Sequence, residues 1–293
     1  MAKRSNNKEK KVIQVWSQNV SNLDQTDLSA RWGLGDLLRG TKNLHGICIE
    51  KNIPFDINFN KHPIGEVLIE SPNSYYFDDE NELCFYSYKT RLALDEYITK
   101  SILETDIINL VTNGFGFWDQ NNIEDFRKFI KPRLRFKKQY EDKAIKILPK
   151  HKTYNVIHIR LGDKKLFGIS KGIPNQIKRI LKKRDPKNTY LITDSIELKE
   201  FAIEKYQLQA LSIIPTHTGV NNDPEDIFGT LLEFMLMGSA NKIETFSVYK
   251  WISGFAHAAS IIYDVPLIDI KKSTLSGKIR SIRKKFKKVR YYA

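Results

Sequence analysis

The sequence predicts an α/β protein whose strands form parallel sheets in two domains. Apolar segments alternate with helical ones in two series, the pattern of parallel sheets covered on both faces. The length of 293 residues suits two domains of about 150 residues each. The hydrophobic fraction of 41% with 28% charged residues is typical of a chain that folds around a sizeable core.

The first series spans residues 12–150 and opens as a βαβ unit. A glycine-containing turn, Trp32-Gly33-Leu34-Gly35-Asp36, separates a strand from a helix, and a second strand follows. Residues 61–122 mix turn signals with short apolar pieces and predict no regular order of elements. The expected elements are a strand at 12–16, a helix at 36–51, a strand at 55–59 and a long basic helix at 123–148 that includes Pro132.

The second series spans residues 151–270 and is more regular. Pro174 occupies a first-turn position that a helix tolerates, and Pro266 closes the series. The expected strands are 155–159, 190–193, 211–214 and 241–244. The expected helices are 174–184, 196–206, 225–239 and 247–261.

The net charge of +14 belongs to the two ends of the chain. Residues 271–293 contain ten basic residues and no acidic one, and residues 1–11 contribute a further +4. The remainder, residues 12–270, is therefore formally neutral. We expect a basic N-terminal tail at 1–11 and a basic C-terminal tail at 271–293, flanking the two domains.

The C-terminal tail has the pattern of a helix that lies on an anionic membrane. Between Lys278 and Arg290, apolar residues recur three or four positions apart among the cations. The alternative is a solvated basic tail without a partner. Nucleic acid is disfavoured because a neutral body offers no basic groove for a phosphate backbone. A non-catalytic protein that binds membrane or nucleic acid through this tail is the alternative function from a different class.

Several common features are missing from the sequence. It has no apolar stretch long enough to span a membrane and no secretory signal at its start, so we expect a cytoplasmic protein, with peripheral membrane association if the tail binds. Cys48 and Cys84 form no CxxC pair and are expected to be buried free thiols. There is no Asp-x-Asp motif and the histidines are scattered, so no metal site is expected.

Three polar clusters follow predicted strands, where ligands bind in open α/β sheets. The first, His158 to Asp163, places Arg160 at a strand end, and a guanidinium can contact two phosphate oxygens at once. Gly162 allows close backbone approach, and Asp163 can orient Arg160. Alternatively, Arg160 and Asp163 form a pair that only braces the loop.

The second and third clusters admit simpler explanations as well. In Thr193-Asp194-Ser195, either Asp194 or Ser195 could be the N-cap of helix 196–206. In Glu244-Thr245-Phe246-Ser247, two hydroxyls stand at the start of helix 247–261, where free N–H groups favour an anion. Capping explains one of these hydroxyls but not both.

Together these segments resemble the fucosyltransferase-type glycosyltransferases, the superfamily of α1,2-, α1,6- and protein O-fucosyltransferases. The similar segments are Val156 to Asp163, Thr193-Asp194-Ser195, Thr245-Phe246-Ser247 and Gly33-Leu34-Gly35-Asp36. The resemblance implies a GT-B fold of two facing Rossmann-like domains. It also implies a metal-independent, inverting enzyme whose second domain binds a nucleotide sugar, typically GDP-fucose, while the first binds a glycan acceptor. The same fold with a xylosyl or rhamnosyl donor is the alternative.

The resemblance also implies roles for individual residues. Arg160 would hold the pyrophosphate with Thr245 and Ser247, and His158 would lie against the base or ribose. An acidic residue of helix 225–239 would contact the guanine edge, with Glu233 the first choice and Asp226 the second. The remaining expected donor-site residues are Gly33, Gly35, Gly162, Asp194, Ser195 and Phe246.

The general base and one departure from the family pattern stay open. Asp36 and Asp163 are candidates to deprotonate the attacking hydroxyl, although each could instead cap a helix or pair with an arginine. Many relatives have a second arginine directly after the first, where this chain has Leu161. Lys164 and Lys165 could replace that charge, but flexible ammonium groups are poorer phosphate clamps.

Overall fold

A computed structural model describes residues 10–18, 32–69, 83–85, 88, 90–112, 121–150, 153–162, 173–213, 218 and 223–273. The chain divides into two compact units. Unit 1 comprises Met1–Lys146 with His217–Phe228, and unit 2 comprises Ile147–Thr216 with Gly229–Ala293. Residues 217–228, expected in the second domain, thus group with the first, and the division falls inside one helix, α8 (Pro224–Gly238).

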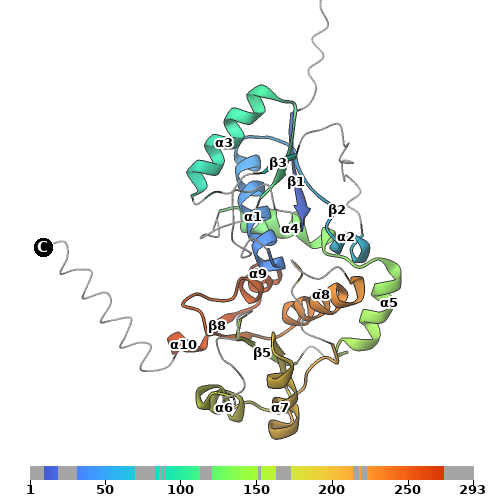
Figure 1. Cartoon of the computed structure of the whole chain (residues 1–293), viewed down its shortest axis with the longest axis vertical. Helices are drawn as coiled ribbons and strands as arrows, with labels where there is room; N and C mark the ends of the chain where they lie inside the picture. The colour runs from blue at the N-terminus through green and yellow to red at the C-terminus, as the bar shows by residue number, and fades with distance from the viewer. Residues whose placement is uncertain are drawn as a thin grey trace, which may run out of the picture. The chain divides into compact units, whose positions relative to one another are not determined.

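Unit 1 is built on a four-stranded parallel sheet with the strand order β2-β1-β4-β3. Figure 1 labels β1, β2 and β3 of this sheet. The strands are β1 (Lys11–Ser17), β2 (Phe55–Lys61), β3 (Leu83–Phe85) and β4 (Ile107–Val111). The helices are α1 (Leu34–Glu50), α2 (Ile64–Val67), α3 (Arg91–Glu104), α4 (Ile123–Ile130), the 3-10 turn η2 (Lys131–Arg133) and α5 (Lys138–Ile147).

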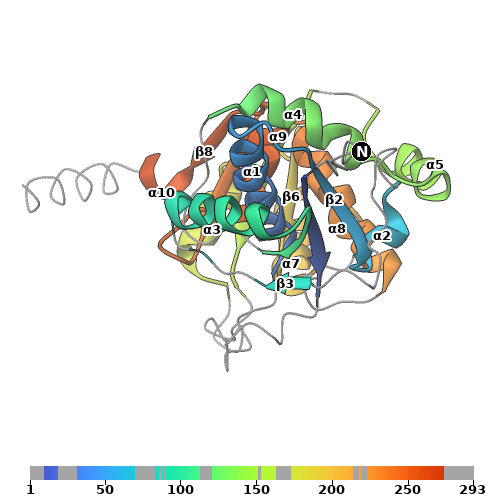
Figure 2. The same cartoon turned by 90° about the horizontal axis from the view of Figure 1, so that it is seen from above.

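Helices α1 and α3 lie side by side and pack on one face of this sheet (Figure 2). Leu44 and Ile47 of α1 and Leu94 and Ile98 of α3 share a buried cluster with Val12 of β1. Burial of such apolar side chains supplies the main stabilisation of the unit.

Two parts of unit 1 differ from the sequence-based expectation. Residues 61–122, which showed no pattern, contain α3 and β4. The expected single helix at 123–148 is wrong, because α4 ends at Ile130 and α5 begins only at Lys138. Pro132 lies in the intervening turn, and a proline has no N–H to continue the helical hydrogen bonds.

Unit 2 contains a second four-stranded parallel sheet, ordered β6-β5-β7-β8. Its strands are β5 (Asn155–Arg160), β6 (Thr189–Thr193), β7 (Ile243–Ser247) and β8 (Leu267–Asp269). Its helices are α6 (Asn175–Lys182), α7 (Ile196–Tyr206), the second part of α8, α9 (Gly254–Tyr263) and α10 (Ile270–Ser273). From β5 the chain continues to β6 on one side and later to β7 on the other, so the strand order reverses between β5 and β7.

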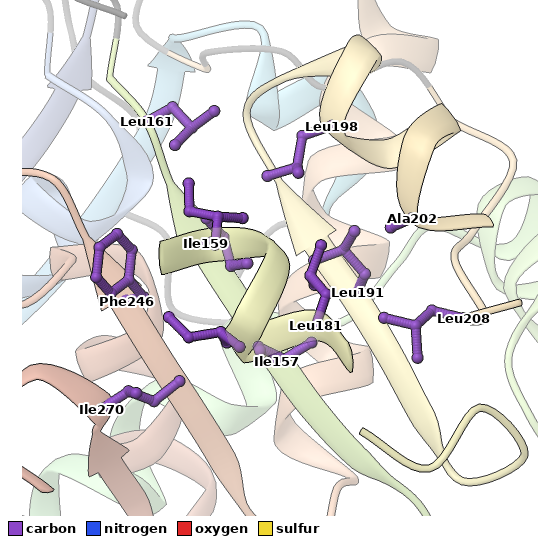
Figure 3. Close-up of a cluster of buried hydrophobic side chains, with 12 residues drawn as sticks. Ile157, Ile159, Leu161, Leu181, Leu191, Leu198, Ala202, Leu208, Phe246 and Ile270 are labelled. Carbon is purple, nitrogen blue, oxygen red and sulfur yellow. The ribbon is translucent and has the colours of Figure 1, made fainter. Parts of the chain in front are cut away.

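One face of this sheet is covered by α6 and α7 (Figure 3). Ile157 and Ile159 of β5 point into this core together with Leu191 of β6 and Phe246 of β7. The opposite face meets α9, since the ring of His158 lies 6.1 Å from that of Phe255. The alternation along β5 therefore separates an apolar face from a face that carries polar residues.

Unit 2 also departs from the expected elements. Residues 211–213 of the expected strand 211–214 are not a strand, and residue 214 lies outside the described residues. Gln209 forms an isolated bridge to Tyr190, and the Lys199 ammonium donates to the carbonyls of Leu211 and Ile213. The expected helix 247–261 begins later, at Gly254, because β7 extends to Ser247.

None of the helices within the described ranges has the length and apolar character needed to cross a membrane.

Candidate nucleotide-sugar site

The carboxyl ends of β5 and β7 meet where the strand order reverses. In open α/β sheets such a reversal leaves a crevice that binds ligands. Arg160 and Ser247 are paired in register at the ends of these two strands. The Val248 N–H donates to the Arg160 carbonyl at 3.0 Å, so the pairing continues one residue beyond β7.

Asp194 holds the backbone that leaves β5. Its two carboxylate oxygens accept hydrogen bonds from the N–H groups of Leu161 and Gly162, each at 2.8 Å. Bonds to a charged acceptor are stronger than neutral ones, so this pair fixes the direction of the chain directly after Arg160. Asp194 therefore shapes the loop, and its donor contact remains a prediction.

Position 162 requires a glycine for two reasons, its backbone conformation and the closeness of Tyr249. Its φ of +94° is a conformation that side chains with a Cβ rarely adopt. A Cβ at this position would lie 2.3 Å from the hydroxyl oxygen of Tyr249. The loop and the Tyr249 ring are thus in direct contact.

Arg160 lies on the polar face of the sheet, next to this aromatic ring. Its guanidinium carbon is 5.9 Å from the Tyr249 ring centre. The alternation of β5 and its register with β7 put Arg160, His158, Thr245 and Ser247 on the same face. The structure thus brings four of the predicted donor-site residues together.

His158 lines this face as a buried, uncharged side chain and is not suited to act as an acid or base. Its side chain is buried, and burial, with a smaller contribution from the charge of Arg160, lowers its pKa to about 3. Its Nδ1 atom is 3.2 Å from the Thr245 hydroxyl. The ring thus sits between Thr245 and Phe255, and its predicted contact with base or ribose remains untested.

The hydroxyls of the third cluster do not cap a helix. Thr245 and Ser247 lie within β7, and the Ser247 hydroxyl accepts the N–H of Tyr249 at 3.2 Å. The helix α9 begins seven residues after Ser247, at Gly254, with Ser253 as its N-cap. The Ser253 hydroxyl is buried, has no hydrogen-bond partner within the described part of the chain, and takes none of the first N–H groups of the helix.

Leu161 and Phe246 belong to the core and not to the ligand face. Both are buried in the cluster formed by α6, α7 and the sheet (Figure 3). A second arginine at position 161 would put a charge into that cluster, which explains why this chain has leucine there. The prediction that Phe246 contacts the donor has no support in this geometry.

Ser195 is the N-cap of α7. Its hydroxyl accepts the N–H of Leu198 at 3.2 Å and donates to the Glu197 carboxylate at 2.8 Å. Of the two caps considered from the sequence, Ser195 is the one that forms, and a donor contact by Ser195 remains untested.

The acidic residues proposed for the guanine edge are placed differently from the expectation. Glu233 is buried in unit 2, and its Oε1 lies 3.4 Å from the Lys199 ammonium. Burial raises the pKa of Glu233 to about 7 although Lys199 opposes the shift. The structure therefore gives Glu233 an internal partner. Asp226 groups with unit 1 rather than with the unit that contains Arg160.

The remaining predicted residues lie in unit 1 or outside the described part of the chain. Gly33 is the N-cap of α1 and Gly35 lies inside that helix. Asp36, in the first turn, forms an ion pair with Arg39. This pairing agrees with the alternative role weighed for Asp36. Asp163, Lys164 and Lys165 are outside the described residues, as is the tail from 274 onward.

Sequence analysis missed the segment between β7 and α9. Tyr249 and Trp251 stack with ring centres 5.0 Å apart and planes 9° from parallel. Lys271, expected in the tail, belongs to the folded unit, because its ammonium donates to the Tyr249 carbonyl. The sequence signal that could have indicated this segment was the pair Tyr249 and Trp251, two positions apart and shortly after the polar end of β7.

No group of three or more histidine, cysteine, aspartate or glutamate side chains suited to a metal ion occurs among the residues that the structure describes.

Comparison with solved structures identifies the architecture. No protein-family model and no curated protein sequence matches the chain. The fucosyltransferase NodZ from Bradyrhizobium, solved as the selenomethionine protein, is similar with a TM-score of 0.55 and 13% identity over 92% of this chain and 96% of that one.

Two further structures of NodZ α1,6-fucosyltransferase agree. One, soaked with GDP-fucose, has a TM-score of 0.53 and 12% identity over 92% of this chain and 97% of that one. The other, co-crystallised with GDP, has a TM-score of 0.51 and 13% identity over 89% and 94%. The prediction of an α/β chain with parallel sheets is therefore confirmed, and the protein has the GT-B-like fold of fucosyltransferases.

Proposed function

We propose that the protein is a glycosyltransferase that takes a sugar from a nucleotide donor bound in unit 2. The observation that carries this proposal is the position of Arg160, at the strand-order reversal and beside Ser247. A fixed cation at this point suits a diphosphate, because the guanidinium keeps its charge and contacts two oxygens at once. The similar fold of NodZ, solved with GDP-fucose and with GDP, supports the same conclusion.

In the proposed chemistry, an acceptor hydroxyl attacks the anomeric carbon and forms a C–O bond as the bond to the nucleoside diphosphate breaks. The hydroxyl proton passes to a general base. Arg160 would stabilise the negative charge that develops on the diphosphate, and the N-terminus of α9 adds N–H groups nearby on the same face of the sheet. Asp194 and Gly162 act through the loop by holding it in place. Attack from the side opposite the leaving group inverts the anomeric centre. We propose that no metal is needed, because Arg160 supplies positive charge at the diphosphate.

GDP-fucose is the proposed donor, and a glycan hydroxyl is the proposed acceptor. The solved NodZ structures contain GDP-fucose or GDP. Because Glu233 is paired with Lys199, it is not the group that we propose to recognise guanine. A xylosyl or rhamnosyl nucleotide on the same fold is the alternative donor. Unit 1 is proposed to bind the acceptor, in a cytoplasmic protein whose C-terminal tail contacts an anionic membrane.

Nucleotide binding tests the proposal directly. Thermal shift is measured for the full chain with GDP, UDP and dTDP, followed by titration calorimetry with the stabilising nucleotide. We expect GDP to stabilise the protein and Arg160→Ala to raise its Kd about 10- to 100-fold, the loss expected for hydrogen bonds to a charged group.

The matched control is Arg179→Ala, which removes an exposed arginine of α6 in the same unit. It should bind GDP as the unchanged protein does. If no nucleotide stabilises the protein, the proposed function is wrong. Stabilisation by UDP or dTDP alone would retain the glycosyltransferase and replace the donor. Turnover that is unchanged in EDTA and gives an inverted product by NMR would support the mechanism.

A further inference from the structure

Trp251 is an exposed aromatic side chain close to the candidate site. Its relative exposure is 66%, whereas Trp16 and Trp32 are buried. It lies in the segment that connects β7 to α9, three residues before the helix. An indole offers a large, rigid apolar surface that a ligand can cover.

The indole is held in a defined orientation. One of its faces stacks on Tyr249, at 5.0 Å and 9°. Tyr249 is fixed in turn, because its N–H donates to Ser247, its carbonyl accepts from Lys271, and its ring contacts Gly162. The exposed surface of Trp251 is therefore presented by a supported pair of rings rather than by a free side chain.

The pair of rings also lies near Arg160. The guanidinium carbon is 5.9 Å from the Tyr249 ring centre, which is 5.0 Å from that of Trp251. The Trp251 ring is consequently no more than about 11 Å from the guanidinium. A sugar attached to a diphosphate at Arg160, followed by an acceptor sugar, spans a separation of this order.

We propose that Trp251, supported by Tyr249, is a stacking platform on unit 2 for one sugar ring of the acceptor glycan, in addition to the acceptor contacts proposed for unit 1. This inference rests on the proposed function. The face of an aromatic ring carries partial negative charge, and the C–H groups on one face of a pyranose carry partial positive charge, so the two surfaces attract while water is displaced.

The surroundings favour a sugar of the acceptor over the nucleotide base. A site that selects a base encloses it and presents polar atoms to its edges. Trp251 and its neighbour Lys250 are exposed. An acceptor glycan extends from an enzyme into solvent, and one half-solvated sugar ring on an open indole suits that path.

The test uses intrinsic fluorescence titration of the full chain with neutral tetrasaccharides of glucose, galactose, mannose or N-acetylglucosamine, and separately with GDP. We expect at least one tetrasaccharide to bind. Trp251→Ala should weaken its binding at least tenfold, Trp251→Phe should retain it within about threefold, and both variants should keep the GDP affinity of the unchanged protein. Binding to Trp251→Ala is followed by calorimetry, since its fluorescence signal is reduced.

Ile203→Ala is the control, because Ile203 is an exposed apolar residue of α7 in the same unit. It should leave both affinities unchanged. The platform is ruled out if GDP binds and no tetrasaccharide affinity depends on Trp251, or if Trp251→Ala reduces GDP affinity, which would assign the ring to the base. Failure of the unchanged protein to bind any nucleotide contradicts the proposed function instead.

Discussion

The two sheets place their polar side chains differently. In unit 1 the polar residues lie within the strands and are buried, among them Gln14, Asp56 and Asn109. In unit 2, His158 and Thr245 are also buried within strands, but Arg160 and Asp194 stand at the strand ends. Both sheets have four parallel strands. A shared architecture therefore does not decide whether a polar residue stabilises the fold or meets a ligand.

The partners of these residues explain the difference. Gln14 bonds to the Thr112 carbonyl, the Thr41 hydroxyl and the Trp16 indole, and the buried Asp56 pairs with Arg133 at 2.8 Å. In unit 2, Asp194 is exposed and binds backbone N–H groups of the neighbouring strand end. Gln14 and Asp56 are paired inside the sheet, where an unpaired buried group is costly, although the buried Asn109 amide has no hydrogen-bond partner among the described residues. Polar residues at strand ends can instead orient a site.

The largest expected effect is on the buried ion pair of unit 1. Asp56→Ala leaves the guanidinium of Arg133 without its partner and should reduce the free energy of unfolding by about 3–5 kcal/mol. Urea denaturation measures the loss. Asp142→Ala, which removes an exposed partner of Lys138, should change it by less than about 1 kcal/mol. Equal effects of the two substitutions would show that the Asp56 pair is not a main support of unit 1.

Acid should weaken unit 1 more than unit 2. Burial lowers the pKa of His45 and His62 in unit 1 to about 4, so below pH 6.5 the unfolded chain takes up protons that the folded unit does not. Each histidine should cost about 2 kcal/mol between pH 7 and pH 5. In unit 2, His158 acts in the same direction, but Glu233 opposes it. Its pKa of about 7 lets the folded form bind a proton while the unfolded carboxylate stays ionised, so its contribution to stability rises as pH falls from 7 to 4.5.

Hydrogen exchange at pH 7 and pH 5, corrected for intrinsic rates, resolves the two units. We expect protection in β1 and β2 to fall more than protection in β5 and β6. His62→Gln should reduce the loss in unit 1 by about half. Equal losses in the two units would contradict the opposing contributions of His158 and Glu233 in unit 2.

A smaller effect is expected at the strand ends of unit 2. Asp194→Ala removes two hydrogen bonds from the loop after Arg160 and should weaken GDP binding about tenfold. The control is Asp185→Ala, which removes an exposed turn carboxylate near the other end of β6 that accepts the Lys187 N–H. Calorimetry measures both. Wild-type GDP affinity in Asp194→Ala would show that the loop needs no such support.

The smallest effect compares one helix cap from each unit. Thr90 caps α3 and Ser195 caps α7. Thr90→Ala and Ser195→Ala should each reduce stability by about 1 kcal/mol, measured by urea denaturation. Neither should change GDP affinity. A marked loss of affinity in Ser195→Ala alone would give Ser195 the donor contact that the resemblance implied.

Prediction from the sequence succeeded where local patterns and packing agree. Helix α7 was expected at 196–206 and has those bounds, because a serine cap precedes it. Helix α3 was missed, since Leu94, Ile98 and Ile102 are buried while Leu92 and Leu103 are exposed, and the apolar residues therefore form no clear stripe. Which leucines face the core depends on the sheet beneath them.

In the candidate site, too, some features follow from local sequence and others depend on tertiary packing. Local sequence was enough to put Arg160 at the end of a strand, because strand periodicity is encoded nearby. Ser247 was expected at the start of a helix and instead ends β7. Their surroundings depend on the register of β5 with β6 and β7, which joins residues more than thirty positions apart. Only the tertiary structure could show that Asp194 binds the Gly162 N–H, that Leu161 belongs to the core, that Lys199 pairs with Glu233, and that Tyr249 supports Trp251 beside Arg160.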